Sequence, residues 1–343
     1  MNEATVLPAV WFVLLGVLLA GYAILDGMTL GVGAILPLVA RDEAERGTLF
    51  RAVGPFWAGY EVWLVAAGGA MVAVFPRLYA DSFSGFYLVL TLVLWLLIAR
   101  GGSIEMRNTV PDGMWRSFWD FVFCISSVLL AFLFGAALGN VIRGVPLDAK
   151  GGFLGTFSLT LNPYALATGA LSVVLLSLQG AGFVARRADG VLRRRARRLG
   201  MVLLCIGACG ALALTAASFA VGADLGANFR AYPALCALPA AAVACFLAAF
   251  LARRAGGDGA ALLASSGAIA FLLASAGASL FPRLLPAYGA PQRSLTITSC
   301  AAPTHNLLTA LVAYVIGMAC IAVYTIYVHR AFRGGLSPTD GYH

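Results

Sequence analysis

Long apolar runs, separated by short stretches that carry most of the charge, make up nearly the whole of this sequence. Each run is close to the roughly 20 residues that an α-helix needs to cross the hydrocarbon core of a bilayer. Nine runs meet this length and are predicted to be transmembrane helices: 7–26, 56–75, 85–100, 118–142, 163–185, 199–220, 233–251, 260–281 and 307–328. The pattern therefore predicts an all-α polytopic membrane protein.

The composition agrees with this pattern and excludes an ordinary soluble domain. Of the 343 residues, 61% are hydrophobic and only 11% are charged, and the mean hydropathy is +0.90. The first run has no preceding Lys or Arg and no clear small-residue cleavage site. We therefore expect it to be a retained first helix and not a removed signal peptide.

The cations are distributed unevenly between the two ends of the predicted helices. The net charge is +8, and 22 of the 23 Lys and Arg residues are arginines between apolar runs, which disfavours nucleic acid as a partner. Assigning successive connections to alternate sides places 17 cations on one side and 6 on the other. Because cytoplasmic loops carry the cation excess, the N-terminus is predicted to be periplasmic and the C-terminus cytoplasmic. The densest block, 186–198, is expected to contact anionic lipid headgroups, in preference to a protein partner.

One carboxylate, Glu61, lies inside the run 56–75, which otherwise has the composition of a membrane-spanning helix. Such a group near the bilayer centre costs about 2.5 to 3.5 kcal/mol, and it usually faces a cavity or a proton relay. Helical spacing places Trp57, Tyr60 and Glu61 on one face. The small residues in 66–73 leave the rest of this helix thin, so that close approach by neighbouring helices is expected.

Further ionisable groups are expected at the ends of predicted helices. Asp26 closes the first run, where it is expected to cap the helix or the following turn, and Asp120 enters the fourth. Arg100, Glu105 and Arg107 follow the third run with mixed charges. These three residues are expected to form either an interfacial ion-pair cluster or a proton entrance.

Histidine and cysteine usage gives no sign of a metal centre. The three histidines are His305 and His329, at the two ends of the last run, and His343 in the tail. No mid-membrane pair is therefore available for bis-histidine haem ligation, although one histidine suffices in some haem proteins. The seven cysteines show no CxxC spacing and are expected to be small buried apolar residues. The chain also lacks P-loop, GxSxG and HExxH motifs, so no catalytic centre is visible in it.

Several ordered segments resemble subunit II of the cytochrome bd family of quinol oxidases. GYAILDGMTLGVG at 21–33 is similar to that family's LDGFDLGVG element, and GPFWAGYEVWLVAAGGA at 54–70 is similar to its GPVWDGNEVWL stretch. IARGGSIEMRNTVPDGMWRSFWDFVF at 98–123 resembles its cation-rich loop. ALGNVIRGVPLD, LNPYALATG, LSLQGA, FPRLLP and YTIYVHRAF continue the match in order, and only about 200–260 is generic.

The resemblance implies a single membrane domain over 1–343, with four-helix bundles at 7–143 and 163–281 and a ninth helix at 307–328. It implies a bacterial inner-membrane heterodimer with subunit I, which would carry two b-type haems, one d-type haem and the quinol site. This chain would be a haem-free scaffold in an enzyme that reduces O2 to water. A small single-helix subunit and membrane lipid are further candidate partners.

The resemblance also implies roles for particular residues. Some members have an oxygen tunnel past the position of Trp63, and some hold a structural quinone, for which Trp57 is a candidate contact or a packing residue. The proton route in this subunit usually includes two acids, but Thr29 and Ala58 stand at those positions here. Glu61 shares a face with Ala58 and is the natural substitute.

The candidate proton-path residues are therefore Glu61, Arg100, Glu105, Asp26 and Thr29. One alternative is a purely structural partner that has lost the proton role, which the loss of both acids favours. A second alternative, a secondary transporter, would require broken helices with midplane polar groups and inverted halves. Neither feature is evident in the sequence.

The predicted topology leads to a direct test. A reporter fused at the C-terminus should read as cytoplasmic, because this orientation keeps the 17-cation side and the block 186–198 inside. An alkaline phosphatase fusion that is active at this position would contradict the orientation.

Overall fold

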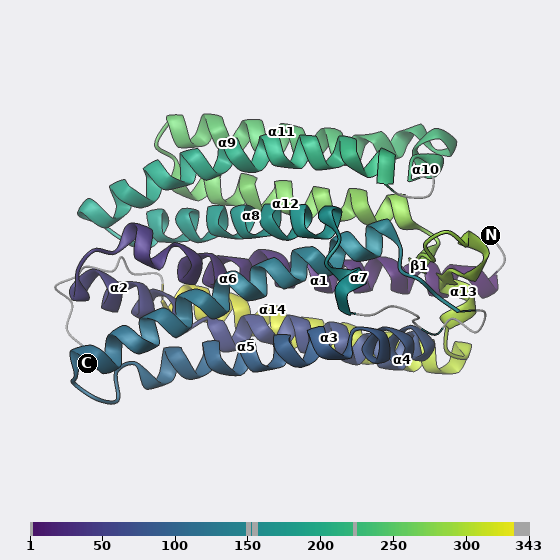
Figure 1. Cartoon of the computed structure of the whole chain (residues 1–343), viewed down its shortest axis with the longest axis horizontal. Helices are drawn as coiled ribbons and strands as arrows, with labels where there is room; N and C mark the ends of the chain where they lie inside the picture. Colours follow the sequence, from purple (N-terminus) through teal and green to yellow (C-terminus); the bar gives the residue numbers. More distant parts are fainter. Residues whose placement is uncertain (1–2, 149–151, 153–156, 222–224, 333–343) are drawn as a thin grey trace.

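A computed structural model describes residues 3–148, 152, 157–221 and 225–332, so His343 lies outside the described part. Within these residues, nine helices are long and apolar enough to cross a membrane, as predicted. They lie side by side along the long axis of the molecule (Figure 1). They are α1 (Glu3–Val39), α3 (Trp57–Val74), α5 (Tyr87–Met106), α6 (Gly113–Arg143), α8 (Pro163–Arg187), α9 (Gly190–Val221), α11 (Ala237–Arg254), α12 (Asp258–Leu280) and α14 (Thr304–Ala331).

Shorter elements lie between these helices along the chain (Figure 1). They are α2 (Glu43–Val53), α4 (Pro76–Gly85), α7 (Phe157–Thr160), α10 (Ala227–Ala231), η1 (Pro233–Cys236), β1 (Arg283–Leu285), η2 (Pro291–Arg293), β2 (Leu295–Thr296) and α13 (Ile297–Cys300). The two short strands pair in antiparallel fashion. α2 lies at one end of the molecule, whereas β1, α10 and α13 lie at the other.

Several predicted helix ends are wrong, and the two errors that affect the buried polar residues are those at Asp26 and Arg100. α1 continues to Val39, so Asp26 lies within the helix and caps neither its end nor a turn. α5 continues to Met106, so Arg100 lies inside the span instead of following it. An apolar run in the sequence ends at its first charge, but a helix continues through a charged residue when a partner on a neighbouring helix neutralises it.

α1 and α8 form the centre of the helix packing. α1 contacts α3, α6, α8 and α12, and α8 also packs against α6 and α9. Their backbones meet at two glycines: a Cβ on Gly31 would lie 1.9 Å from the Leu176 carbonyl oxygen, and one on Gly180 would lie 2.1 Å from the Gly31 carbonyl carbon. Small residues allow such close approach, which maximises van der Waals contact between helices in lipid.

The small residues of α3 were expected to allow close packing by a neighbouring helix, but no helix of this chain packs against Gly68 and Gly69. A Cβ on Gly68 or Gly69 would meet no atom within 4 Å. The small residues that bring helix backbones together lie instead on α1, α6 and α8, including Gly135 and Gly139 of α6. The division into bundles at 7–143 and 163–281 stays a prediction, because α8 packs against α6 and α1 as well as against α9.

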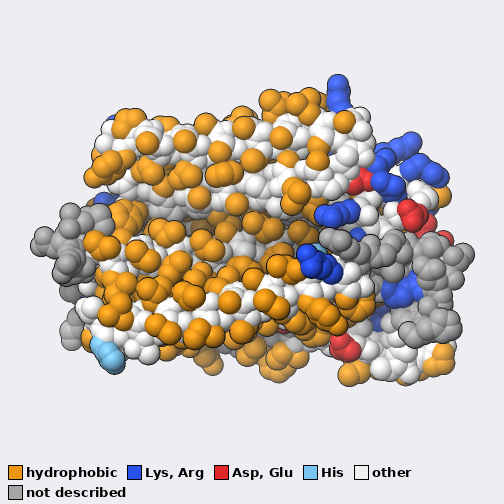
Figure 2. All heavy atoms as spheres, turned by 180° about the vertical axis from the view of Figure 1, so that it is seen from behind, with side chains coloured by type: hydrophobic (Ala, Val, Ile, Leu, Met, Phe, Trp, Pro, Cys, Tyr) orange, Lys and Arg blue, Asp and Glu red, His pale blue; other side chains and the backbone are white. Residues whose placement is uncertain are grey.

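The outer surface has the distribution expected of a membrane protein. Figure 2 shows a broad band of hydrophobic side chains over the helices, with Lys and Arg gathered mainly toward one end. Large side chains in the band are well exposed, as for Trp95 at 67%. An apolar belt with charges at its ends matches a bilayer with its two aqueous faces.

The α1–α8 contact gives a stability prediction. Gly31→Ala should destabilise the protein by about 3 kcal/mol, at the upper end of the overpacking range, because backbone atoms oppose the new methyl group. Gly68→Ala is the matched control, since its methyl group meets open space. The thermal midpoint of the purified membrane complex checks this, and equal midpoints for the two variants would show that the helices separate at little cost.

Candidate functional site

The site begins with Asp26, which lies in the middle of α1 with its side chain fully buried. The glycine that follows it lets α8 cover this part of α1, because a Cβ on Gly27 would lie 2.8 Å from the Leu176 side chain. Thr29, one turn along α1, donates its hydroxyl proton to the backbone carbonyl of Asp26 at 3.0 Å and also contacts the Asp26 carboxylate. Asp26 is therefore held in a place that water does not reach.

Arg100 of α5 neutralises this carboxylate and is itself fully buried. Its Nη2 donates to Asp26 Oδ1 at 2.6 Å, and its Nη1 donates to Asp26 Oδ2 at 3.0 Å. Nη2 also donates to the Thr29 hydroxyl. Two parallel bonds between a guanidinium and a carboxylate are the strong geometry for such a pair, so α1 and α5 are joined here by a bidentate ion pair.

Glu61 of α3 is the third ionisable member of the cluster. Arg100 Nη1 donates to Glu61 Oε1 at 3.2 Å, which is a longer contact than either bond to Asp26. The Glu61 side chain is 24% exposed, whereas those of Arg100 and Asp26 have no exposure. The cluster thus contains one cation and two carboxylates, and only one of the carboxylates reaches the surface of the chain.

Two tryptophans flank the cluster through glycine contacts. A Cβ on Gly21 of α1 would lie 2.2 Å from the nearest carbon of the Trp63 ring, so this ring packs directly against the α1 backbone. The indole Nε1 of Trp63 is buried without a partner among the described residues. The Trp57 ring lies 3.0 Å from the Cβ position of Gly101, next to Arg100. The Trp57 ring therefore packs against the residue that follows Arg100, whereas the Trp63 ring packs against α1 more than one turn before Asp26.

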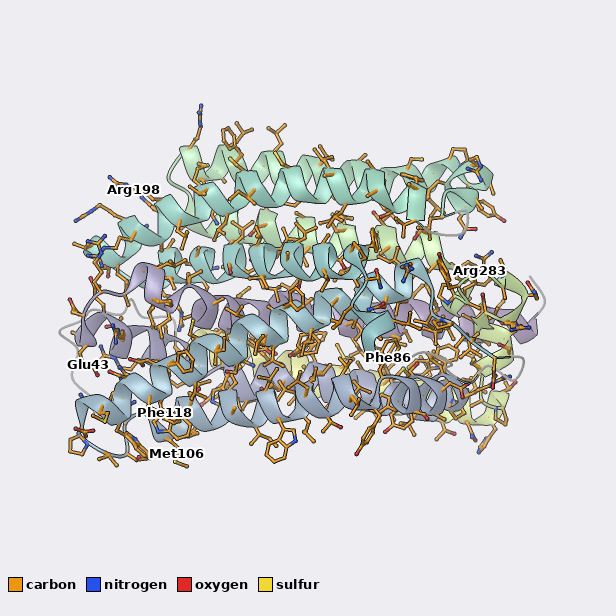
Figure 3. The ribbon with its side chains drawn as sticks, in the orientation of Figure 1. Glu43, Phe86, Met106, Phe118, Arg198 and Arg283 are labelled. Carbon is orange, nitrogen blue, oxygen red and sulfur yellow. The ribbon has the colours of Figure 1, made fainter. Side chains whose placement is uncertain are left out.

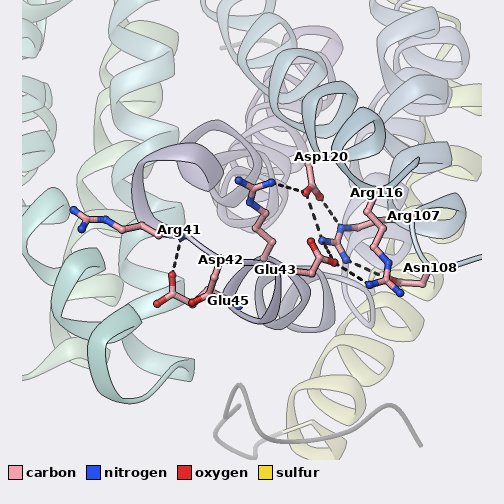
Figure 4. A network of polar contacts seen from close by, with 9 residues as sticks. Arg41, Asp42, Glu43, Glu45, Arg107, Asn108, Arg116 and Asp120 are labelled. Carbon is pink, nitrogen blue, oxygen red and sulfur yellow. Dashed lines mark hydrogen bonds and ion pairs between the residues drawn. The ribbon is translucent and has the colours of Figure 1, made fainter. Parts of the chain in front are cut away.

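A second polar network lies at the end of the molecule where α2 begins (Figure 4). Arg107 Nε donates to Asp120 Oδ1 at 2.6 Å, and Arg107 Nη2 donates to Glu43 Oε1 at 3.0 Å. Arg116 also contacts Glu43, at 3.3 Å, and Arg46 contacts Asp120, at 3.4 Å. This network fastens α2 to α5 and α6.

Arg100, Glu105 and Arg107 do not form the ion-pair cluster that was one of the two expectations for them, and the proton entrance stays a prediction. Arg100 belongs to the buried cluster and Arg107 to the network around Asp120, while Glu105 is exposed and forms no ion pair with the described residues. The helical period explains this separation. Residues seven apart share a face, which here points into the bundle, and residue 105 faces outward.

His329 joins the last helix to α3. Its Nε2 lies 3.2 Å from the Tyr60 hydroxyl, and its Nδ1 lies 2.9 Å from the Thr325 carbonyl oxygen. His305 is exposed at the opposite end of α14. Among the described residues, no group of three or more His, Cys, Asp or Glu side chains could hold a metal ion.

Sequence reasoning found Asp26, Thr29, Glu61 and Arg100, but it did not predict that they meet. It also missed Tyr22, which is buried one helical turn before Asp26. The signal that could have placed Asp26 mid-helix is the apolar sequence that continues beyond it to Val39.

Membrane-length helices, an apolar outer belt and a buried arginine between two carboxylates define a polytopic α-helical integral membrane protein. The family model described as cytochrome bd terminal oxidase subunit II matches residues 7–332. The chain belongs to that family. It is a subunit of a membrane oxidoreductase, the bd-type terminal oxidase.

Curated relatives match over nearly the whole length. The chain is 32% identical to the "Probable cytochrome oxidase subunit 2" of Haemophilus influenzae, covering 98% of this chain and 97% of that one. It is 30% identical to the "Cytochrome bd-I ubiquinol oxidase subunit 2" of Escherichia coli, covering 99% and 98%. The fold is similar to that of a chain in the bd oxidase from Geobacillus thermodenitrificans, with a TM-score of 0.80, 20% identity and coverage of 95% and 98%.

The buried ion pair predicts different effects for its two carboxylates. Asp26→Asn removes the closer of the two carboxylates that pair with Arg100 and leaves its buried charge with only the longer ion pair to Glu61, so it should destabilise the complex by about 3 to 5 kcal/mol. Glu61→Gln keeps an oxygen acceptor for Arg100 at a partly exposed position, so it should cost less than about 1 kcal/mol. The yield and thermal midpoint of the purified complex measure both effects. A complex that tolerates Asp26→Asn as well as Glu61→Gln would contradict this ranking.

Proposed function

We propose that this chain is the subunit II of a quinol oxidase that reduces O2 to water, and that Glu61 exchanges protons within it. The family match and the full-length relatives support the first part, since one of these relatives is named as a ubiquinol oxidase subunit. The exposure of Glu61 beside a fully buried ion pair supports the second part.

The argument for Glu61 rests on the charge balance of the cluster. Arg100 and Asp26 neutralise one another through two short bonds in a site without solvent. Glu61 is then a second carboxylate that shares the same guanidinium through one longer bond. A carboxylate that is not needed for neutrality and reaches the surface of its chain is suited to gain and lose a proton.

The other candidate path residues have supporting roles in this proposal. Asp26 and Thr29 hold Arg100, which in turn orients Glu61. Glu105 is exposed on the same helix as Arg100, about 7.5 Å further along the axis, and would stand near the entrance from the cytoplasm. Helix α5 would then carry both the entrance and the internal cation.

Roles for the two tryptophans are part of the same proposal. Trp63 would line an apolar oxygen path, and its position against α1 at Gly21 supports a place between helices. Trp57 would contact a structural quinone or serve as packing, and its ring against Gly101 supports the packing role.

The remaining assignments come from the family. Two b-type haems, one d-type haem and the quinol site would lie in subunit I, with no haem in this chain. A small single-helix subunit would be an additional partner. The chain would cross a bacterial inner membrane with its N-terminus periplasmic and its C-terminus cytoplasmic, and its helices would group as two bundles plus α14.

A purely structural role is the second candidate, and two observations favour it. Ala58 carries no titratable group, and the hydroxyl of Thr29 is used to bind Asp26 and Arg100. Neither residue could replace a proton-carrying acid. In this case Glu61 would only complete the coordination of Arg100.

Turnover of the Glu61→Gln variant separates the two candidates. Glutamine keeps the size of the side chain and an oxygen for Arg100 but does not titrate, so oxygen uptake by the purified complex should fall at least about tenfold if proton transfer limits the rate. Haem absorbance and assembly should match those of the unmodified complex.

Asp81→Asn provides the matched control. This variant also removes a carboxylate that pairs with an arginine. The partner is Arg77, one turn away on α4, and α4 lies at the opposite end of the molecule from α2. This variant should respire at the unmodified rate. Equal oxygen uptake in Glu61→Gln would assign proton delivery to the partner subunit and leave this chain as scaffold.

A further inference from the structure

A pocket of about 470 Å³ lies at the end of the bundle opposite the arginine-rich connection between α8 and α9. It is lined by the final residues of α6, α9 and α12 and by the segment that follows β1. Figure 3 labels Arg283 at this end of the molecule and Arg198 at the other. The pocket is therefore separate from the Arg100 cluster and from the network around Asp120.

Two arginines line this pocket, and neither forms an ion pair with a carboxylate of the described residues. Arg143 lies in the last turn of α6, and its guanidinium carbon is 4.6 Å from the centroid of the Tyr288 ring. Arg283 is the first residue of β1 and is half-buried. The C-terminal dipole of α6 favours a positive charge at Arg143, but it does not account for Arg283, which lies outside any helix.

Few cations lie at this end of the bundle, yet two of them, Arg143 and Arg283, line the same pocket. Arg77, Arg230 and Arg293 are the other described arginines there, and none of them lines the pocket. Arg77 pairs with Asp81, and Arg293 is exposed with a 3.5 Å contact to the Leu147 carbonyl oxygen. Two guanidinium groups that form no ion pair with a carboxylate of the described residues line one concavity, and this indicates that an anion completes the site.

The rest of the lining points to an amphiphilic ligand. Ile142, Val221, Leu225 and Leu280 provide apolar walls, and they continue the apolar belt of the membrane-length helices. Because α6, α9 and α12 end at this pocket, it lies where the hydrocarbon core meets the headgroup region. Tyr288 is 54% exposed at the same level, as is usual for aromatic residues at this interface.

We propose that this pocket binds a phosphate group, with Arg143 and Arg283 as its two donors. The phosphodiester of an anionic phospholipid fits best, because its acyl chains would contact the apolar walls while the guanidinium groups bind its oxygens. Free phosphate offers the same oxygens without the chains.

Native mass spectrometry of the detergent-purified complex, titrated with short-chain phosphatidylglycerol, tests this site. The unmodified complex should hold one more lipid than R143Q/R283Q, and the double variant should bind this lipid about 100-fold more weakly at the site, or about tenfold for each guanidinium lost. R293Q removes an arginine from the same end but outside the pocket, so it should behave like the unmodified complex.

The titration is repeated with phosphatidylcholine and with inorganic phosphate alone. A preference for phosphatidylglycerol that depends on both arginines supports the lipid headgroup, and arginine-dependent binding of inorganic phosphate without this preference supports the free anion. If the double variant does not assemble, R283Q alone leaves the Arg143–Tyr288 contact in place and should bind about tenfold more weakly. Binding that is equal in the variants and the unmodified complex, or no binding of either phosphate compound, would overturn the proposal.

Discussion

The ion pair between Arg100 and Asp26 is the constraint on which the rest of the site depends. Removing a guanidinium and a carboxylate from water costs several kcal/mol for each ion, and only close, well-directed bonds offset this cost. Here two parallel bonds and the Thr29 hydroxyl supply them. The pair therefore joins α1 to α5 at one register, with both side chains fully buried.

The glycines of α1 make this burial compatible with tight packing. Gly27 and Gly31 lie on the side of α1 that meets α8, and side chains there would collide with Leu176 and with the α8 backbone. Because α8 approaches so closely, it shields the region around Asp26. The same arrangement leaves α3 on the other side of the pair, where Glu61 reaches both Arg100 and the surface of the chain.

α5 organises two separate polar sites because Arg100 and Arg107 are two helical turns apart. Both arginines are buried, yet Arg100 contacts acids of α1 and α3, whereas Arg107 contacts acids of α2 and α6. The spacing could have been recognised in the sequence, since residues seven apart lie on one face. Their partners could not, because Asp26 and Glu43 are distant in the chain and the short helix α2 was not predicted from the apolar pattern.

Local composition and ordered motifs are enough to predict the number of membrane-spanning helices, the concentration of arginines in the connections of one side and the membership of the family. Packing between helices that are distant in the chain is what makes α1 and α5 continue through Asp26 and Arg100, and what lets Glu61 share the cation of a buried pair. A charge ends an apolar run in the sequence, but whether it ends a helix depends on the opposite charge that another helix brings to it.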